Sequence, residues 1–199
     1  VLVNQTKFIE VDVGPDALKL RQANPDYTIF HGYAYATWPE MLKLAKDYGM
    51  KSKFLVTVWS ADAPALEKLG PSVDGLIGFA PYPYTTIGAT TPMLKVIDAQ
   101  IRKRDPKYDG YPTHGYMQSW VNAMMAAKAA ELVIDAKKPV TGENMKIALE
   151  TLKNWDTGGV FGTNVAIRDH KMPVGRVWRF EMKQGQPIKA VPVSSFIQL

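Results

Sequence analysis

The chain has 199 residues, of which 46% are hydrophobic and 22% are charged, which is ordinary for a globular protein and excludes a disordered chain. It carries a net charge of +5 and no cysteine, so thiolate catalysis, disulfides and cysteine-based zinc sites are excluded. Its lysines and arginines are scattered without interleaved aromatic residues, and we expect no nucleic-acid partner. No apolar run approaches the roughly 18 residues that a membrane-spanning helix needs.

The first 23 residues predict a strand followed by a short helix. The chain opens on Val1-Leu2-Val3, which is typical of the interior of a strand, and we interpret this N-terminus as a truncation. Asp16 is expected to cap a helix that runs to Ala23, with Ala17, Leu18 and Leu20 turned inward.

Residues 24–80 alternate between strand and helix patterns. Asn24-Pro25-Asp26 predicts a turn, and the apolar run from Tyr27 to Phe30 predicts a strand covered on both faces. Thr37 and Glu40 form a capping box for an amphipathic helix that Gly49 ends. Further strands are expected at 53–58 and 73–80, with a short helix between them at 64–69. This alternation indicates an α/β fold with a parallel sheet flanked by helices.

Residues 81–199 change in character. Pro81-Tyr82-Pro83-Tyr84-Thr85-Thr86 predicts a stiff extended crossing between two lobes. Helices are expected at 92–104 and 114–137, and Thr141 is expected to cap another helix. Two β segments, at 164–167 and 174–182, precede a hairpin turn at 183–186 and a final strand.

The sequence carries no recognised catalytic motif. It lacks a G-x-S-x-G nucleophile elbow, a P-loop and a G-x-G-x-x-G fingerprint, and its three histidines are spread over separate segments. Asp169-His170 lies in a turn without a nucleophile motif nearby, so we interpret it as a surface turn. We therefore expect no catalytic residue, no metal and no cofactor. An α/β enzyme would require a nucleophile or an acid–base pair that the cleft residues do not supply.

Aromatic and small polar residues instead follow the carboxyl ends of the predicted parallel strands, where open α/β sheets bind their ligands. Aromatic side chains at such loop tips supply apolar surface together with a hydrogen-bonding group. This combination suits a small organic ligand that is bound without reaction. The alternative is that these residues only fill space at the sheet edge or at an interface between lobes. These residues are Tyr33, Tyr35, Trp59, Ser60 and Tyr82.

Several loose motifs occur in a specific order. They are Ala23-Asn24-Pro25-Asp26-Tyr27 leading to Gly32-Tyr33, Asp74-Gly75-Leu76-Ile77-Gly78 followed by Pro81-Tyr82, Gly115-Tyr116, and Trp155-Asp156-Thr157-Gly158-Gly159 followed by Asp169-His170. In this order the chain resembles the periplasmic solute-binding proteins of the leucine/isoleucine/valine type (periplasmic-binding fold type I), which serve ABC importers.

The resemblance implies two α/β lobes joined by three crossings, of which this chain represents the C-terminal half only. Residues 1–83 would form the second lobe, 84–172 the returning part of the first lobe, and 173–199 strands that cross back to the second lobe. The missing N-terminal half of the same protein is then an expected partner, because residues 90–172 lack a sheet to pack against.

The resemblance also implies a ligand-binding site without a cofactor. Tyr33 or Tyr35 corresponds to the aromatic residue that the family places against the ligand, and we include Trp59, Ser60, Tyr82 and His114 among the expected ligand-binding residues. Family members that bind amino acids usually offer an acid after the next strand, where Asp62 is the nearest acid here. We therefore expect an aromatic, amide-like or carboxylate ligand rather than a branched-chain amino acid.

The function implied by the resemblance is capture of a small organic ligand (aromatic, amide-like or amino-acid-like) between two lobes and delivery to the membrane permease of an ABC importer. The protein would be periplasmic, or lipid-anchored and extracellular, with a signal peptide in its precursor. A ligand-sensing regulator on the same fold, of the amide-sensor type, remains the alternative.

Overall fold

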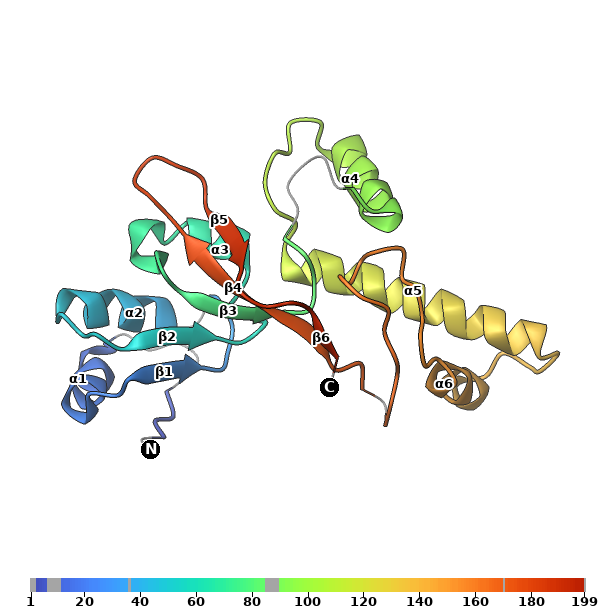
Figure 1. Cartoon of the computed structure of the whole chain (residues 1–199), viewed down its shortest axis with the longest axis horizontal. Helices are drawn as coiled ribbons and strands as arrows, with labels where there is room; N and C mark the ends of the chain where they lie inside the picture. The colour runs from blue at the N-terminus through green and yellow to red at the C-terminus, as the bar shows by residue number, and fades with distance from the viewer. Residues whose placement is uncertain (1–2, 7–11, 36, 85–89, 170, 199) are drawn as a thin grey trace. The chain divides into compact units, whose positions relative to one another are not determined.

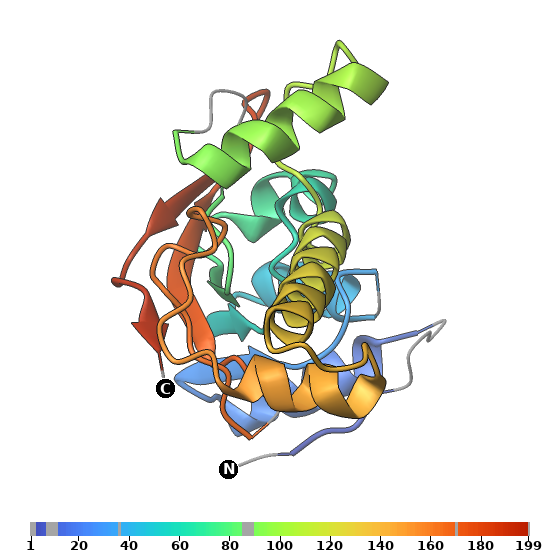
Figure 2. The ribbon, with the colours of Figure 1, turned by 90° about the vertical axis from the view of Figure 1, so that its right-hand side faces the viewer.

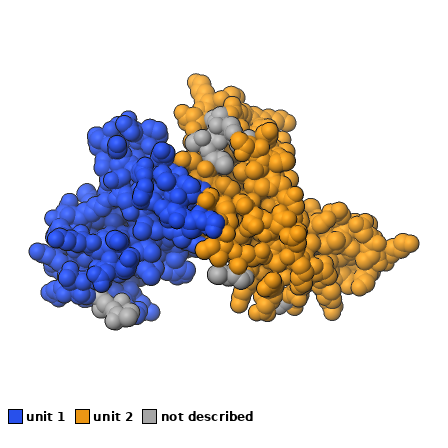
Figure 3. Space-filling model, viewed as in Figure 1, with its two compact units in different colours: residues 1–80, 177–195 blue, residues 81–176, 196–199 orange. Residues whose placement is uncertain are grey.

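The computed structural model describes residues 3–6, 12–35, 37–84, 90–169 and 171–198 of the chain. These residues form two compact units, which Figure 3 shows in different colours. Unit 1 comprises residues 1–80 and 177–195, and unit 2 comprises residues 81–176 and 196–199. The chain thus leaves unit 1 at residue 81 and returns to it at residue 177.

Unit 1 is built on a sheet in which three neighbouring strands are parallel. The first strand pairs with the second and the second with the third in parallel register, so that Phe30 lies opposite Val56 and Val56 opposite Gly78. The fourth strand follows in the strand order and pairs with an antiparallel fifth. The strands are β1 (Tyr27–Phe30), β2 (Lys53–Val56), β3 (Ile77–Ala80), β4 (Val174–Glu181) and β5 (Lys189–Pro192) (Figure 1). Parallel strands separated by helices confirm the predicted α/β fold.

Helices alternate with the parallel strands of unit 1. The apolar spacing of α2 places Trp38, Leu42 and Ala45 in the core. The ring of Trp38 lies 5.4 Å from the ring of Phe30 on β1, so α2 packs against the sheet. The helical segments are α1 (Gly14–Ala23), α2 (Trp38–Asp47), α3 (Ala63–Glu67) and the 3₁₀ segment η1 (Gly70–Val73).

The C-terminus of α2 forms the glycine-dependent cap that the sequence predicts. Gly49 has a φ of +67°, and its N–H donates to the carbonyl oxygen of Lys46. The next N–H, from Met50, donates to the carbonyl oxygen of Ala45. These two bonds satisfy carbonyl groups that a helix end leaves unpaired, which is the Schellman arrangement.

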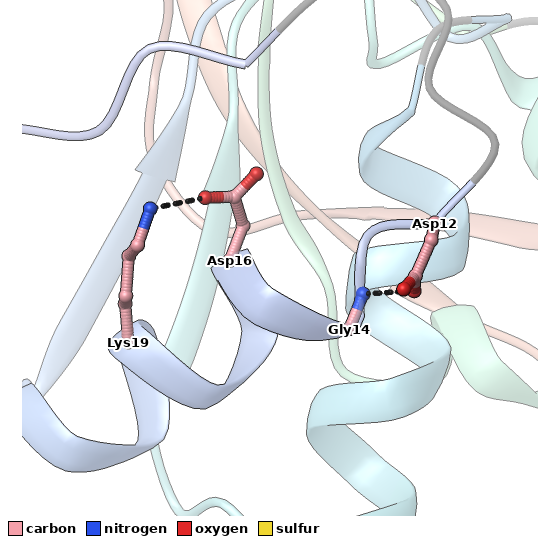
Figure 4. A network of polar contacts seen from close by, with 4 residues as sticks. All are labelled: Asp12, Gly14, Asp16 and Lys19. Atoms are coloured by element: carbon pink, nitrogen blue, oxygen red, sulfur yellow. Dashed lines mark hydrogen bonds and ion pairs between the residues drawn. The ribbon is translucent and has the colours of Figure 1, made fainter.

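The start of α1 differs from the prediction, because Asp16 does not cap the helix. The N-cap residue is Val13, and the carboxylate of Asp12 accepts a 2.8 Å hydrogen bond from the N–H of Gly14 (Figure 4). Asp16 lies in the first turn and pairs with Lys19 at 3.1 Å. A carboxylate in the first turn is still stabilised by the positive end of the helix dipole.

The capping box predicted at the start of α2 is also absent. Thr37 occupies the N-cap position, but its backbone is already helical, with φ −68° and ψ −23°, and its side chain makes no capping hydrogen bond. A threonine caps a helix from an extended backbone, which directs its oxygen toward the N–H groups of the first turn.

Two strand predictions need correction. β1 is not covered on both faces, since Tyr27 is 56% exposed and Ile29 is 69% exposed. β1 ends the order of the described strands, and apolar composition alone does not distinguish such a strand from a central one. The third strand begins at Ile77 rather than at Val73, which belongs to η1.

Unit 2 is largely helical. It contains α4 (Pro92–Arg104), α5 (His114–Asp135), α6 (Gly142–Glu150) and β6 (Ile197–Gln198), which pairs with the first residues of β4. The N–H groups of Tyr116 and Asn144 donate to the hydroxyls of Thr113 and Thr141, so the predicted cap of α6 is confirmed. α6 packs beside α5 (Figure 2). The buried core of this unit includes Tyr82, Leu94, Ile97, Met117, Val121, Val160 and Phe161.

The β segment predicted at 164–167 is not a strand. Val165 makes only an isolated antiparallel bridge with Trp155. Val1, Leu2, Thr85, Thr86 and His170 lie outside the described residues, so the predictions made for them are not tested. In the described part of the chain, no helix is long and apolar enough to cross a membrane.

Candidate ligand-binding surface

The parallel register of β1 and β2 places the loops that follow them side by side. The N–H of Thr57 donates to the carbonyl oxygen of Phe30 at 3.2 Å, which continues the pairing past the end of the strands. The N–H of Ala34 then donates to the carbonyl oxygen of Trp59 at 3.1 Å. The backbones of loops 31–35 and 57–62 are therefore held together at the carboxyl edge of the sheet, where α/β folds bind ligands.

Ser60 joins the same two loops through its side chain. Its hydroxyl donates a 2.6 Å hydrogen bond to the carbonyl oxygen of Gly32, and the residue is fully buried. In this structure Ser60 therefore fixes the position of the loop that carries Tyr33 and Tyr35. A direct contact between Ser60 and a ligand remains a prediction.

Two aromatic rings meet at this edge. The ring centroids of Tyr33 and Trp59 are 5.6 Å apart with an interplanar angle of 45°. Tyr33 is 50% exposed and Trp59 is partly buried. Such a tilted pair is a favourable aromatic geometry and presents apolar surface with one phenol group.

Tyr35 lies on the same loop and is 67% exposed. Partial burial raises the pKa of its phenol, and the nearby negative charge of Asp62 raises it further. The phenol therefore stays protonated at neutral pH and is able to donate a hydrogen bond.

Asp62 is buried and serves as the N-cap of α3. Its carboxylate accepts a 3.4 Å hydrogen bond from the N–H of Ala65, and the residue is 6% exposed. The acid nearest to the candidate surface therefore has a structural role at the start of a helix.

Thr57 was not among the site residues predicted from the sequence. Its hydroxyl lies 3.2 Å from Nδ1 of His31, which couples the first residue after β2 to the first residue after β1. The pair could have been predicted from the positions of His31 and Thr57 in the sequence, because each directly follows one of two paired parallel strands.

The other two predicted site residues, Tyr82 and His114, lie together in unit 2. The Tyr82 ring is 5.5 Å from the ring of Phe161 and 6.0 Å from that of His114, and both predicted residues are more than 90% buried. Burial raises the pKa of Tyr82 to about 12. His114 Nε2 is 3.1 Å from the hydroxyl of Tyr84. In this structure both residues belong to the unit 2 core, and a ligand contact by either remains a prediction.

The described residues show no metal site. No group of three or more histidine, aspartate and glutamate side chains is placed to hold a metal ion in the part of the chain that the structure describes. The unit 1 surface offers the rings of Tyr33, Tyr35 and Trp59, of which the two tyrosines also carry phenol groups, and such groups bind a ligand through contact and hydrogen bonds.

Solved structures with the same fold are numerous. A branched-chain amino acid ABC transporter protein from Thermus thermophilus with bound valine matches with a TM-score of 0.71 at 18% identity, over 95% of this chain and 50% of that one. A solute-binding protein from Rhodopseudomonas palustris HaA2, in complex with p-hydroxybenzoic acid, matches with a TM-score of 0.70 at 15% identity, over 95% and 50%. A fatty acid ABC transporter substrate-binding protein from Thermomonospora curvata matches with a TM-score of 0.68 at 17% identity, over 94% and 47%.

These identities are low, so the structural matches establish the fold alone, and the chain spans about half the length of the proteins it matches. A comparison with curated protein sequences gives no match. A family model described as periplasmic binding protein, however, matches residues 3–187, which is most of the chain. The chain therefore belongs to the periplasmic binding protein family.

Proposed function

We propose that this chain is part of a solute-binding protein that captures a small organic ligand between two lobes and delivers it to the membrane permease of an ABC importer. Membership of the periplasmic binding protein family supports this function. The protein would work outside the cytoplasm, in the periplasm or on a lipid anchor, and would not be an enzyme. Binding without reaction agrees with the groups at the surface of unit 1, where rings and hydroxyls are available to a ligand.

The observation that carries the proposal is the coupling of loops 31–35 and 57–62. The backbone bond from Ala34 to Trp59 and the side-chain bond from Ser60 to Gly32 tie together the two loops that carry the Tyr33 and Trp59 rings. A preorganised aromatic surface loses less conformational entropy when a ligand binds, which raises affinity. We propose that this surface is one wall of the ligand cleft.

We further propose an aromatic, amide-like or carboxylate ligand rather than a branched-chain amino acid. An α-amino acid brings an ammonium group, and burial of that charge without a carboxylate partner is costly. The nearest acid, Asp62, is 6% exposed and caps α3. A ligand without a positive charge avoids this cost and gains from contact with the two rings.

The second wall is proposed to come from the half of the fold that this chain lacks. The matched structures are about twice as long, and α5 is rich in alanine and methionine although Ala123, Ala126, Ala127 and Ile134 on it are exposed. An apolar helix of this kind is usually packed on more than one side. We propose that unit 1 corresponds to the second lobe, that residues 84–172 return to the first lobe, and that residues 173–199 cross back toward the second.

Isothermal calorimetry tests this function in the longer polypeptide, defined here as this chain joined to the missing half of the fold. We expect p-hydroxybenzoate to bind and leucine not to bind. Trp59→Ala should weaken binding about fivefold or more, because a ring in such a contact contributes about 1 kcal/mol. Leu18→Ala is the matched control and should leave binding unchanged, because Leu18 on α1 is 44% exposed rather than turned inward as the sequence predicted. Tight leucine binding would contradict the proposed ligand class.

A further inference from the structure

The ring of Phe30, the last residue of β1, contacts both α2 and the loop that follows β1. Toward α2, it lies 5.4 Å from the ring of Trp38, with an interplanar angle of 32°. Trp38 is 3% exposed and belongs to the buried core of unit 1. Because buried side chains are closely packed, Trp38 limits how far the Phe30 ring can move.

The same ring lies against the backbone of Gly32 in the loop. A Cβ at Gly32 would lie 2.7 Å from Cζ and 2.8 Å from Cε1 of Phe30, which is closer than side chains approach one another. Gly32 is not one of the glycines with a positive φ, so its backbone conformation does not require glycine. The close approach of the Phe30 ring is therefore what excludes a side chain at position 32.

Gly32 is also the point at which this loop joins the loop after β2. Its carbonyl oxygen accepts the 2.6 Å hydrogen bond from Ser60. Two residues later, the N–H of Ala34 donates to the carbonyl oxygen of Trp59. Tyr33 lies in the chain between these two connections, and its ring contacts the ring of Trp59. A displacement of the Gly32 backbone would therefore move Tyr33 relative to Trp59.

We propose that Phe30 is a positioning residue for the ligand-binding surface. Its ring, supported by Trp38, fixes the position of the Gly32 backbone. That position in turn sets the separation of the Tyr33 and Trp59 rings. Phe30 acts through the loop and does not touch the ligand. The consequence for ligand binding rests on the proposed function, whereas the geometry of the two rings does not depend on which ligand binds.

The alternative is that the Phe30 ring only packs α2 against β1. Substitutions would then change the stability of unit 1 and leave the Tyr33 and Trp59 pair unchanged. The contact with Gly32 favours the positioning role, because the ring touches the loop itself and not only the helix.

NMR of the longer polypeptide, with isotope labels on its tyrosine and tryptophan rings, tests the geometry without a ligand. Nuclear Overhauser effects between the rings of Tyr33 and Trp59, whose centroids are 5.6 Å apart, report the pair. Gly32→Ala should remove most of these effects, because the added Cβ overlaps the Phe30 ring. Phe30→Leu should weaken them, because the loop loses its support. The double variant should recover them relative to Gly32→Ala, because leucine lacks the ring atoms that the Cβ would meet.

Calorimetry with p-hydroxybenzoate on the same polypeptides measures the consequence for binding. Gly32→Ala should weaken binding about tenfold, the usual order of effect for an overpacked site. The double variant with Phe30→Leu should bind more tightly than Gly32→Ala alone. Gly142→Ala is the matched control, because no atom lies within 4 Å of its Cβ, and it should change neither measurement.

The two measurements separate this inference from the proposed function. If the wild-type polypeptide does not bind p-hydroxybenzoate, the proposed ligand is wrong and the Overhauser effects alone decide the inference. Unchanged Overhauser effects in Gly32→Ala, even with a lowered Tm, would overturn it, as would a double variant that recovers nothing. If Gly32→Ala does not fold, Phe30→Leu decides, since full Overhauser effects in that variant would overturn the inference and weakened ones would support it.

Discussion

The hydroxyl of Ser60 donates a 2.6 Å hydrogen bond to the carbonyl oxygen of Gly32, across two loops that follow neighbouring parallel strands. The two residues are 28 positions apart in the chain, and Ser60 is fully buried. This bond and the backbone bond from Ala34 to Trp59 tie together the two loops that carry the aromatic surface. The geometry of the proposed ligand-binding wall therefore depends on Ser60, even if Ser60 does not contact the ligand.

Ser60→Ala should lower the stability of the chain by about 1 kcal/mol, which is typical for one intramolecular hydrogen bond. It should also speed amide exchange at Ala34, because the loop loses one of the hydrogen bonds that connect it to loop 57–62. Ser72→Ala is the matched control, since Ser72 donates a 2.8 Å bond to Leu69 in the same unit but far from these loops in the chain. Denaturant unfolding and hydrogen exchange measure both effects. Identical exchange at Ala34 in the two variants would show that Ser60 does not order the loop.

Asp62→Ala should destabilise the chain by about 1 kcal/mol, the usual effect of removing an N-cap. Asp62→Asn should retain most of that stability, because asparagine caps helices about as well as aspartate. Both variants should lower the pKa of Tyr35 toward its ordinary value, since they remove a negative charge beside the phenol. NMR titration of the tyrosines measures this shift. A Tyr35 pKa that is unchanged in both variants would contradict the placement of Asp62 near this ring.

The stability of unit 2 should fall as the pH rises from 10 to 12. Burial raises the pKa of Tyr82 from 10.0 to about 12, so between these values the folded protein holds a proton that the unfolded chain releases. The stabilisation is fully present below pH 10 and amounts to about 2–3 kcal/mol by the linkage relation. Tyr82→Phe keeps the ring and removes the titrating group, so its unfolding free energy should depend less on pH in this range. Parallel pH profiles for the two proteins would contradict the burial of this phenol.

Two glycine substitutions should change the free energy of unfolding in opposite directions. Gly49→Ala should cost about 1–2 kcal/mol, because Gly49 has a φ of +67° where a Cβ is unfavourable, although no atom lies within 4 Å of that Cβ. Gly115→Ala lies in the first turn of α5 with open space around its Cβ, and it should gain about 0.5 kcal/mol from helix propensity. Thermal unfolding compares them. A neutral Gly49→Ala would contradict the left-handed cap of α2.

The elements with strong periodic patterns were predictable from the sequence. The apolar spacing of α2 predicts that helix, and Gly49 predicts where it ends. Pro92 and Thr141 mark the starts of α4 and α6. The order of strands and helices in residues 24–80 was sufficient to identify a parallel α/β sheet. These signals are local, so they do not depend on how distant segments pack.

The errors arise where tertiary structure decides. Thr37 and Asp16 have the right side chains for caps, but the backbone at Thr37 is helical and α1 begins two residues before Asp16. The apolar run of β1 does not reveal that this strand ends the sheet. The aromatic pair Tyr33 and Trp59 was predictable because both follow parallel strands, whereas the bond from Ser60 to Gly32 requires the three-dimensional register.

The central claim is that the rings at the carboxyl ends of β1 and β2 form one wall of a ligand cleft. A crystal structure of the longer polypeptide with its retained ligand tests it most directly. We predict that the ligand lies in van der Waals contact with the rings of Tyr33 and Trp59 and carries no ammonium group paired with Asp62. A ligand that contacts neither ring, bound elsewhere on the protein, would contradict the account.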